Sequence, residues 1–134
     1  MDATFLEKIK ADFPWIHFRQ GRKFIFRPPH TIVIGTDEPY DSLLLMHELG
    51  HALCKHTNFA MDVERLKMER EAWEKAREMA SLYGVDFDDE FMECELDTYR
   101  EWLHKKSRCP ECGLTRFQTP DGVYHCPKCE NFKS

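Results

Sequence analysis

Two histidines four residues apart are the first residues in this chain whose types and spacing can support chemistry. The segment reads His47-Glu48-Leu49-Gly50-His51. On a helix, side chains at this spacing project from one face on successive turns, so both imidazoles can bind one metal ion about 2 Å away. Glu48 then lies beside the ion, where its carboxylate can take a proton from water. The pattern predicts a catalytic zinc site with Glu48 as the general base.

A third ligand must come from elsewhere, because a catalytic zinc has three protein ligands and one open position. A helix predicted over residues 62–83 would run back past the histidines and bring Glu69 and Glu71 level with the metal. The apolar residues of this helix define one inward face, and Glu69 projects into its middle while Glu71 points nearly opposite. A carboxylate on an apolar face is costly unless it is paired or binds a metal. We therefore favour Glu69 over Glu71 as the third ligand.

Other reactive residues near the motif have simpler interpretations. His56 follows His51 by five positions, not by the six of a metzincin motif, and we interpret it as a solvated histidine at a helix end. Cys54 and Cys94 fall on predicted helices, and we interpret them as buried or idle thiols.

Four further cysteines form two pairs near the end of the chain. Cys109-Pro-Glu-Cys112 and Cys126-Pro-Lys-Cys129 are separated by 13 residues. Such pairs present four thiolates to one tetrahedral ion, and a hairpin between them is typical of a zinc ribbon. We predict a closed structural zinc here, whose binding supplies the folding free energy of the module. Whether the module binds protein, binds nucleic acid or only braces its neighbour is left open.

Apolar periodicity and turn residues predict the helices and strands that carry these side chains. A first helix over residues 2–13 precedes three short strands, and the helix with the two histidines precedes two more helices. The expected ranges are 15–19, 23–27 and 31–35 for the strands and 41–56, 62–83 and 88–106 for the later helices. The fold class is therefore α+β: a small zincin-like domain over residues 1–106, consisting of a short sheet, the histidine helix and two further helices, followed by a four-cysteine zinc ribbon over residues 107–134.

Charge and hydropathy limit the partners. The formal net charge is −5 over 134 residues, which argues against a protein whose main task is to grip a nucleic-acid backbone. No secretory segment is visible, and no apolar stretch approaches the roughly 18 residues of a membrane span. We expect a cytoplasmic protein without a membrane partner, and direct nucleic-acid binding stays open.

The two motifs together resemble those of the ImmA/IrrE family of metallo-endopeptidases. The segment from His47 to His51, followed by Glu69-x-x-Ala72 in the next helix, carries the resemblance. It implies that His47, His51 and Glu69 are the zinc ligands of a gluzincin-like enzyme and that Glu48 is its base. The family is often encoded on mobile elements and prophages, where members cleave a repressor with a DNA-binding domain. The resemblance therefore implies a protein substrate of this kind.

This resemblance covers residues 31–80, and the chain departs from the family in two respects. Trp73 stands where the family commonly has Asn or Asp, four residues after the ligand Glu, so the surroundings of the ligands must differ. The family also does not usually end in a module of four cysteines.

Peptide hydrolysis is the predicted reaction, with zinc activating water and Glu48 transferring protons. An extended substrate is expected to pair with an edge of the sheet at residues 31–35. One alternative is an SprT-like protease of DNA-bound proteins, which needs a third histidine that this chain lacks between His56 and His104. The other alternative is a non-catalytic, zinc-braced interaction module.

Overall fold

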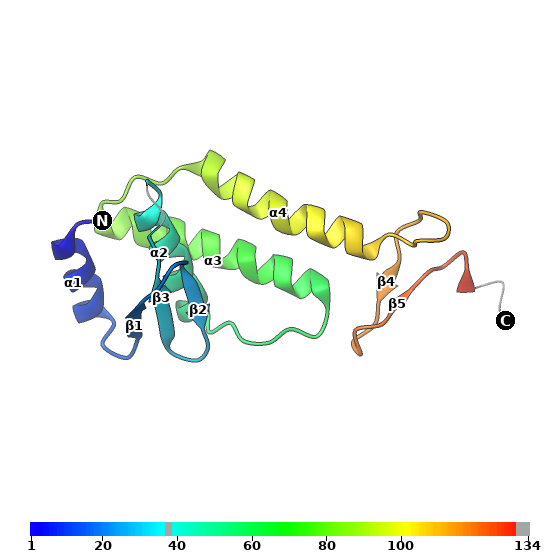
Figure 1. The fold of residues 1–134 in the computed structure, drawn as a ribbon, viewed down its shortest axis with the longest axis horizontal. Helices are drawn as coiled ribbons and strands as arrows, with labels where there is room; N and C mark the ends of the chain where they lie inside the picture. Colours follow the sequence, from blue (N-terminus) through cyan, green and yellow to red (C-terminus); the bar gives the residue numbers. More distant parts are fainter. Residues whose placement is uncertain (37–38, 131–134) are drawn as a thin grey trace. The chain divides into compact units, whose positions relative to one another are not determined.

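Helices and two small sheets alternate along the part of the chain that the structure, a computed structural model, describes: residues 1–36 and 39–130 (Figure 1). This mixed architecture confirms the α+β class. The elements in chain order are α1 (Ala3–Asp12), β1 (His17–Gln20), β2 (Ile25–Arg27), β3 (Thr31–Ile34), α2 (Asp41–Leu53), α3 (Asp62–Tyr83), α4 (Asp89–Ser107), β4 (Phe117–Gln118) and β5 (Tyr124–His125).

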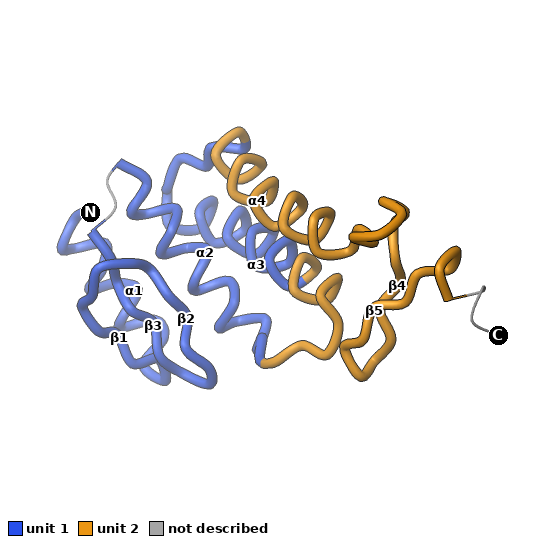
Figure 2. The backbone as a smooth tube through the Cα atoms, turned by 45° about the vertical axis from the view of Figure 1, so that its right-hand side comes forward, with its two compact units in different colours: residues 1–57, 68–89 blue, residues 58–67, 90–134 orange. Residues whose placement is uncertain are grey.

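The chain forms two compact units, coloured separately in Figure 2. Unit 1 comprises residues 1–57 and 68–89, and unit 2 comprises residues 58–67 and 90–134. Helix α3 contributes to both, because its first turns belong to unit 2 and the remainder belongs to unit 1. The boundary expected between residues 106 and 107 falls inside unit 2, and the division at that point stays a prediction.

The three-stranded sheet of unit 1 has the order β1-β3-β2. β1 pairs with β3 in parallel, and β2 pairs with β3 antiparallel, with Phe26 opposite Ile32. The expectation that residues 31–35 form a free edge is wrong, because β3 is hydrogen-bonded on both sides. Its buried apolar run, Ile32 to Ile34, is the composition that a central strand requires. The short strand β2 is an edge instead.

Helix α2 packs against β2 and β3 and is apolar through most of its length. Leu45, Met46 and Leu49 are fully buried, so tertiary packing holds this helix in place. The helix ends at Leu53 and not at the expected residue 56. Lys55 has a φ of 57°, which reverses the backbone immediately after the helix.

Helix α3 buries the predicted inward face within unit 1. Ala72, Trp73, Ala76 and Ala80 are fully buried there. The helix ends at Tyr83, as the sequence predicts, and Gly84 follows in the left-handed conformation with a φ of 68°. No helix among residues 1–36 and 39–130 combines the length and the apolar character needed to cross a membrane.

Within unit 2, a buried carboxylate ties the hairpin β4–β5 to the first turn of α3. Tyr124 Oη donates to Asp62 Oδ2 at 2.7 Å, and Lys106 Nζ lies 3.0 Å from the same oxygen. The backbone N–H of Asp62 donates to Gln118 Oε1 at 2.5 Å. Burial alone would raise the pKa of Asp62, but these hydrogen bonds lower it below its ordinary value. Asp62 therefore stays ionised and organises this part of the unit.

Candidate active site and metal centres

Helices α2 and α3 bring His47, His51 and Glu69 together in unit 1. Glu69 Oε2 lies 2.7 Å from His47 Nε2 and 3.0 Å from His51 Nε2. The three ligand atoms lie within 4.8 Å of one another, and the residues are at most 9% exposed. Neighbouring ligands of a tetrahedral zinc lie roughly 3.3 Å apart, so this set of two imidazoles and one carboxylate fits a metal ion.

A backbone contact between the two helices sets this convergence. A Cβ atom at Gly50 would clash with the carbonyl oxygen of Ala72, so only glycine allows α2 to approach α3 so closely. Because Glu69 lies one turn before Ala72, the same contact brings its carboxylate to the histidines.

Two aromatic rings that do not belong to the ligand set pack against the two imidazoles. Trp73, which is fully buried, stacks on His47 with ring centroids 4.3 Å apart and planes 14° from parallel. Phe26 on β2 lies parallel to the ring of His51, with centroids 6.2 Å apart. The ring of His47 is therefore restrained by stacking on Trp73. The position of Trp73 beside the ligands was expected from the sequence, whereas that of Phe26 was not.

The electrostatics of the cluster favour the protonation states that a metal needs. Burial lowers the pKa of His47, which favours the neutral imidazole. Burial alone would raise the pKa of Glu69, but hydrogen bonds from both histidines bring it well below its ordinary value. Neutral imidazoles and an ionised carboxylate are the forms that bind zinc.

Glu48 lies beside this cluster and has the properties of a base that works near neutral pH. It is 8% exposed, and its Oε1 is 3.9 Å from His47 Nδ1. Burial raises its pKa to about 7, and the opposing effects of His51 and the backbone of Phe26 only partly offset the rise. A carboxylate with a pKa near the working pH can both accept and return a proton.

The raised pKa of Glu48 predicts a pH-dependent stability in the metal-free protein. Its pKa is about 7 in the folded chain against an ordinary 4.5. The folded chain therefore holds the proton of Glu48 more tightly than the unfolded chain does. The stability that this proton provides is fully present below pH 4.5 and is lost as the pH rises through 7. Glu48→Gln stays neutral at every pH. We expect the metal-free variant to exceed metal-free wild type in stability by up to roughly 3 kcal/mol at pH 8, but not at pH 4.5. Urea unfolding at both pH values measures this, and an equal difference at both would contradict it.

Glu71 and His56 lie outside the three-ligand group. Glu71 is half-buried, and its Oε1 lies 3.7 Å from His56 Nε2. The interpretation of His56 as a solvated histidine is wrong, because its side chain is only 10% exposed and contacts His51. Burial lowers the pKa of His56. The left-handed Lys55 is the reason: it turns the chain back so that His56 covers the end of the helix.

The four paired cysteines converge in unit 2. Sγ of Cys109 lies 3.9 Å from Sγ of Cys129, and Sγ of Cys112 lies 3.5 Å from Sγ of Cys126. Four sulfurs bound to a tetrahedral zinc would lie roughly 3.8 Å apart, so the group fits such an ion. A hydrogen bond from the backbone N–H of Cys112 is the largest cause that lowers the pKa of Cys109 to about 7. The pairing of β4 with β5 supplies the expected hairpin between the cysteine pairs.

Replacing one of these ligands is expected to unfold the module locally. Cys112→Ser leaves three thiolates, and a module this small has little apolar core to replace the metal. We expect one zinc fewer per chain and fast amide exchange in β4 and β5, with the histidine site still loaded. Zinc analysis and hydrogen exchange measure both effects, and Cys94→Ser, an exposed thiol on α4, is the matched control. A protected hairpin in Cys112→Ser would contradict a structural role for the metal.

Comparisons of the chain with models of protein families, with curated proteins and with solved structures find no match in any of the three. The resemblance to the ImmA/IrrE family therefore stays a prediction from the two motifs.

Proposed function

We propose that this protein is a zinc-dependent metallo-endopeptidase that hydrolyses peptide bonds of an intracellular protein. One observation carries the proposal. A buried set of two imidazoles and one carboxylate, on two adjoining helices, lies next to a second buried carboxylate whose pKa is close to neutral. A set of ligands without a neighbouring base could hold a structural ion. Hydrolysis also requires a base that lies close to the ion without binding it.

His47, His51 and Glu69 would hold the ion, and Glu48 would handle protons. A bound zinc supplies Lewis acidity, which polarises a carbonyl group and eases the ionisation of water. Glu48 accepts the proton of the attacking water and passes it to the amine that leaves. Its burial limits the access of competing solvent, and in the metal-free chain the same burial raises its pKa to about 7. Trp73 and Phe26 keep the imidazole planes in place during this exchange.

The free edge of β2 is the proposed position for an extended substrate. β2 pairs with β3 on one side only, and Phe26 at its centre contacts His51. A peptide added to this edge would run beside Glu48 and the ligand set, with its backbone aligned by hydrogen bonds. This edge replaces residues 31–35, which the sheet order makes unavailable.

The carboxylate in the ligand set supports a gluzincin-like enzyme with a zincin-like fold over the SprT-like alternative. His56 does not act as a third histidine, since its Nδ1 is directed at His51 Nδ1 at 2.9 Å. As the resemblance implies, a repressor or regulator encoded on a mobile element or prophage is the proposed substrate class. The group of four cysteines is proposed to hold a second, structural zinc.

Metal analysis combined with a hydrolysis assay tests the proposed function. We expect two zinc ions per chain, one at each group. Cleavage of unfolded casein should disappear when chelation empties the histidine site and return when one equivalent of zinc is restored. Hydrolysis that continues unchanged in metal-free protein would reject a metallopeptidase, and a chain that takes up zinc at the cysteines alone would reject the site.

A further inference from the structure

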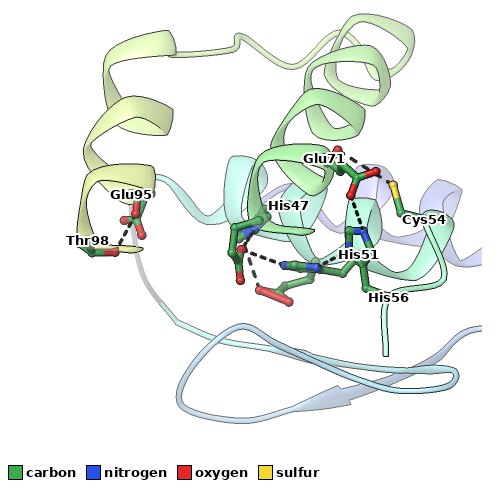
Figure 3. A network of polar contacts seen from close by, with 9 residues as sticks. His47, His51, Cys54, His56, Glu71, Glu95 and Thr98 are labelled. Atoms are coloured by element: carbon green, nitrogen blue, oxygen red, sulfur yellow. Dashed lines mark hydrogen bonds and ion pairs between the residues drawn. The ribbon is translucent and has the colours of Figure 1, made fainter. Parts of the chain in front are cut away.

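His51, His56 and Glu71 form a chain of polar contacts that leads away from the ligand set (Figure 3). Nδ1 of His51 lies 2.9 Å from Nδ1 of His56, and Nε2 of His56 lies 3.7 Å from Glu71 Oε1. The first distance is that of a hydrogen bond, whereas the second is too long for one and brings opposite partial charges together. The first two side chains are nearly buried and the third reaches the surface.

The backbone is built to bring His56 back onto His51. After α2 ends, Lys55 takes the left-handed conformation with a φ of 57°, and the N–H of His56 donates to the carbonyl oxygen of His51 at 3.1 Å. A left-handed residue other than glycine costs about 1 kcal/mol or more, so surrounding contacts must hold it there. The contact between the two imidazoles is one that this turn makes possible.

The direction of the hydrogen bond follows from what His51 must do. If Nε2 of a neutral His51 binds a metal, its only proton is on Nδ1. Nδ1 of His56 must then accept, so a neutral His56 carries its own proton on Nε2, the nitrogen that faces the carboxylate of Glu71. With a metal ion at Nε2 of His51, this assignment gives the contact between the two imidazoles one donor and one acceptor, and it directs the remaining N–H of His56 toward the carboxylate of Glu71.

We infer that His56 and Glu71 are positioning residues for the ligand His51, holding its ring plane and its Nδ1–H tautomer so that Nε2 is presented to the ion. The inference rests on the proposed metal site, but it concerns the affinity of that site and not the hydrolytic step. Trp73 stacks on the ring of His47 and restrains its plane. The two histidines are therefore supported by different means.

Zinc affinity, measured by competition with a chromogenic chelator, tests the inference in the full-length protein. His56→Phe keeps a ring but removes the acceptor, and we expect zinc at the histidine site to bind roughly 10- to 100-fold more weakly. His56→Asn restores an acceptor at the position of Nδ1, and we expect affinity within a few-fold of wild type. The zinc at the cysteines serves as an internal reference for a correctly folded chain.

A second measurement reports the tautomer directly. In ¹⁵N NMR spectra of the zinc-loaded protein, the Nδ1–H proton of His51 should be protected from exchange in wild type and in His56→Asn, but not in His56→Phe. Glu71→Gln should weaken zinc binding several-fold, whereas Glu74→Gln, an exposed carboxylate on the same helix, should not.

The inference is overturned if His56→Phe binds zinc as tightly as wild type, or if His56→Asn is as weak as His56→Phe. If Glu71→Gln and Glu74→Gln changed the zinc affinity equally, Glu71 would not be a positioning residue. Failure of the proposed function is distinct, because wild type itself would then take up no zinc at the histidine site or would bind it without hydrolysing peptides.

Discussion

Glu48→Gln should abolish nearly all peptide hydrolysis while both zinc ions stay bound. General acid–base catalysis contributes roughly 10²- to 10⁴-fold, and we expect a loss of that size in kcat. The amide of Gln is close in shape to the carboxylate but cannot accept the proton of the attacking water. Because Glu48 lies beside the ligand set without belonging to it, the metal content should not change. Initial rates on a quenched fluorescent peptide and zinc analysis on the same preparation measure the two effects.

Glu74→Gln is the matched control for this variant, since it removes an exposed carboxylate of α3 with the same chemistry. Its rate should equal that of wild type. If Glu48→Gln also retained the wild-type rate, another group would be the base and the assigned role of Glu48 would be wrong. If Glu48→Gln lost its zinc, the residue would act as a ligand, and the geometry of the site would need another explanation.

Glu69→Ala should remove one zinc ion per chain and all measurable hydrolysis. The variant leaves two imidazoles on one face of α2 and takes away the only ligand from α3, so the ion loses both its third bond and the negative charge that balances it. The cysteine site should keep its zinc. Anomalous scattering at the zinc edge, together with metal analysis, would show which of the two sites is empty.

Glu71→Ala tests whether Glu71, and not Glu69, is the third ligand. It should keep two zinc ions at stoichiometric metal, with only the reduced affinity expected of a residue that acts through His56. Equal zinc occupancy at the histidine site in Glu69→Ala and wild type would reject Glu69 as the third ligand. Loss of that zinc in Glu71→Ala alone would transfer the role to Glu71.

Much of the site was predictable because its determinants are local. The four-residue spacing of His47 and His51 is set by the helix itself, and one polar residue on an otherwise apolar face identified Glu69. The same periodicity predicts an inward face of this helix, and the structure buries Ala72 and Ala76 on that face. These signals depend on neighbouring residues of one helix, and only the expectation that the helix over residues 62–83 runs back past the histidines adds a tertiary assumption.

The remaining features depend on contacts between segments, which a single sequence does not specify. The apolar run of β3 suits a central strand, but which strands flank it depends on its pairing with β1, which is parallel and joins residues distant in the sequence. Lys55 carries no signature of a left-handed residue, since glycine or asparagine usually occupies such positions. The burial of His56 follows from that turn. The prediction that His56 is solvated was therefore wrong because the turn at Lys55 could not be foreseen, and not because of the chemistry of histidine.

The main-chain contact between Gly50 and Ala72 has a consequence for how the protein acquires its ion. Two helices separated by bulky side chains could change their separation as those side chains move. Helices whose backbones are in direct contact can have only one closest separation. The ligand cluster is then largely preorganised once the helices have docked, and little conformational entropy remains to be lost when metal arrives. Uptake should accordingly resemble entry into a rigid receptor, with an association rate limited by access and by the release of hydration water.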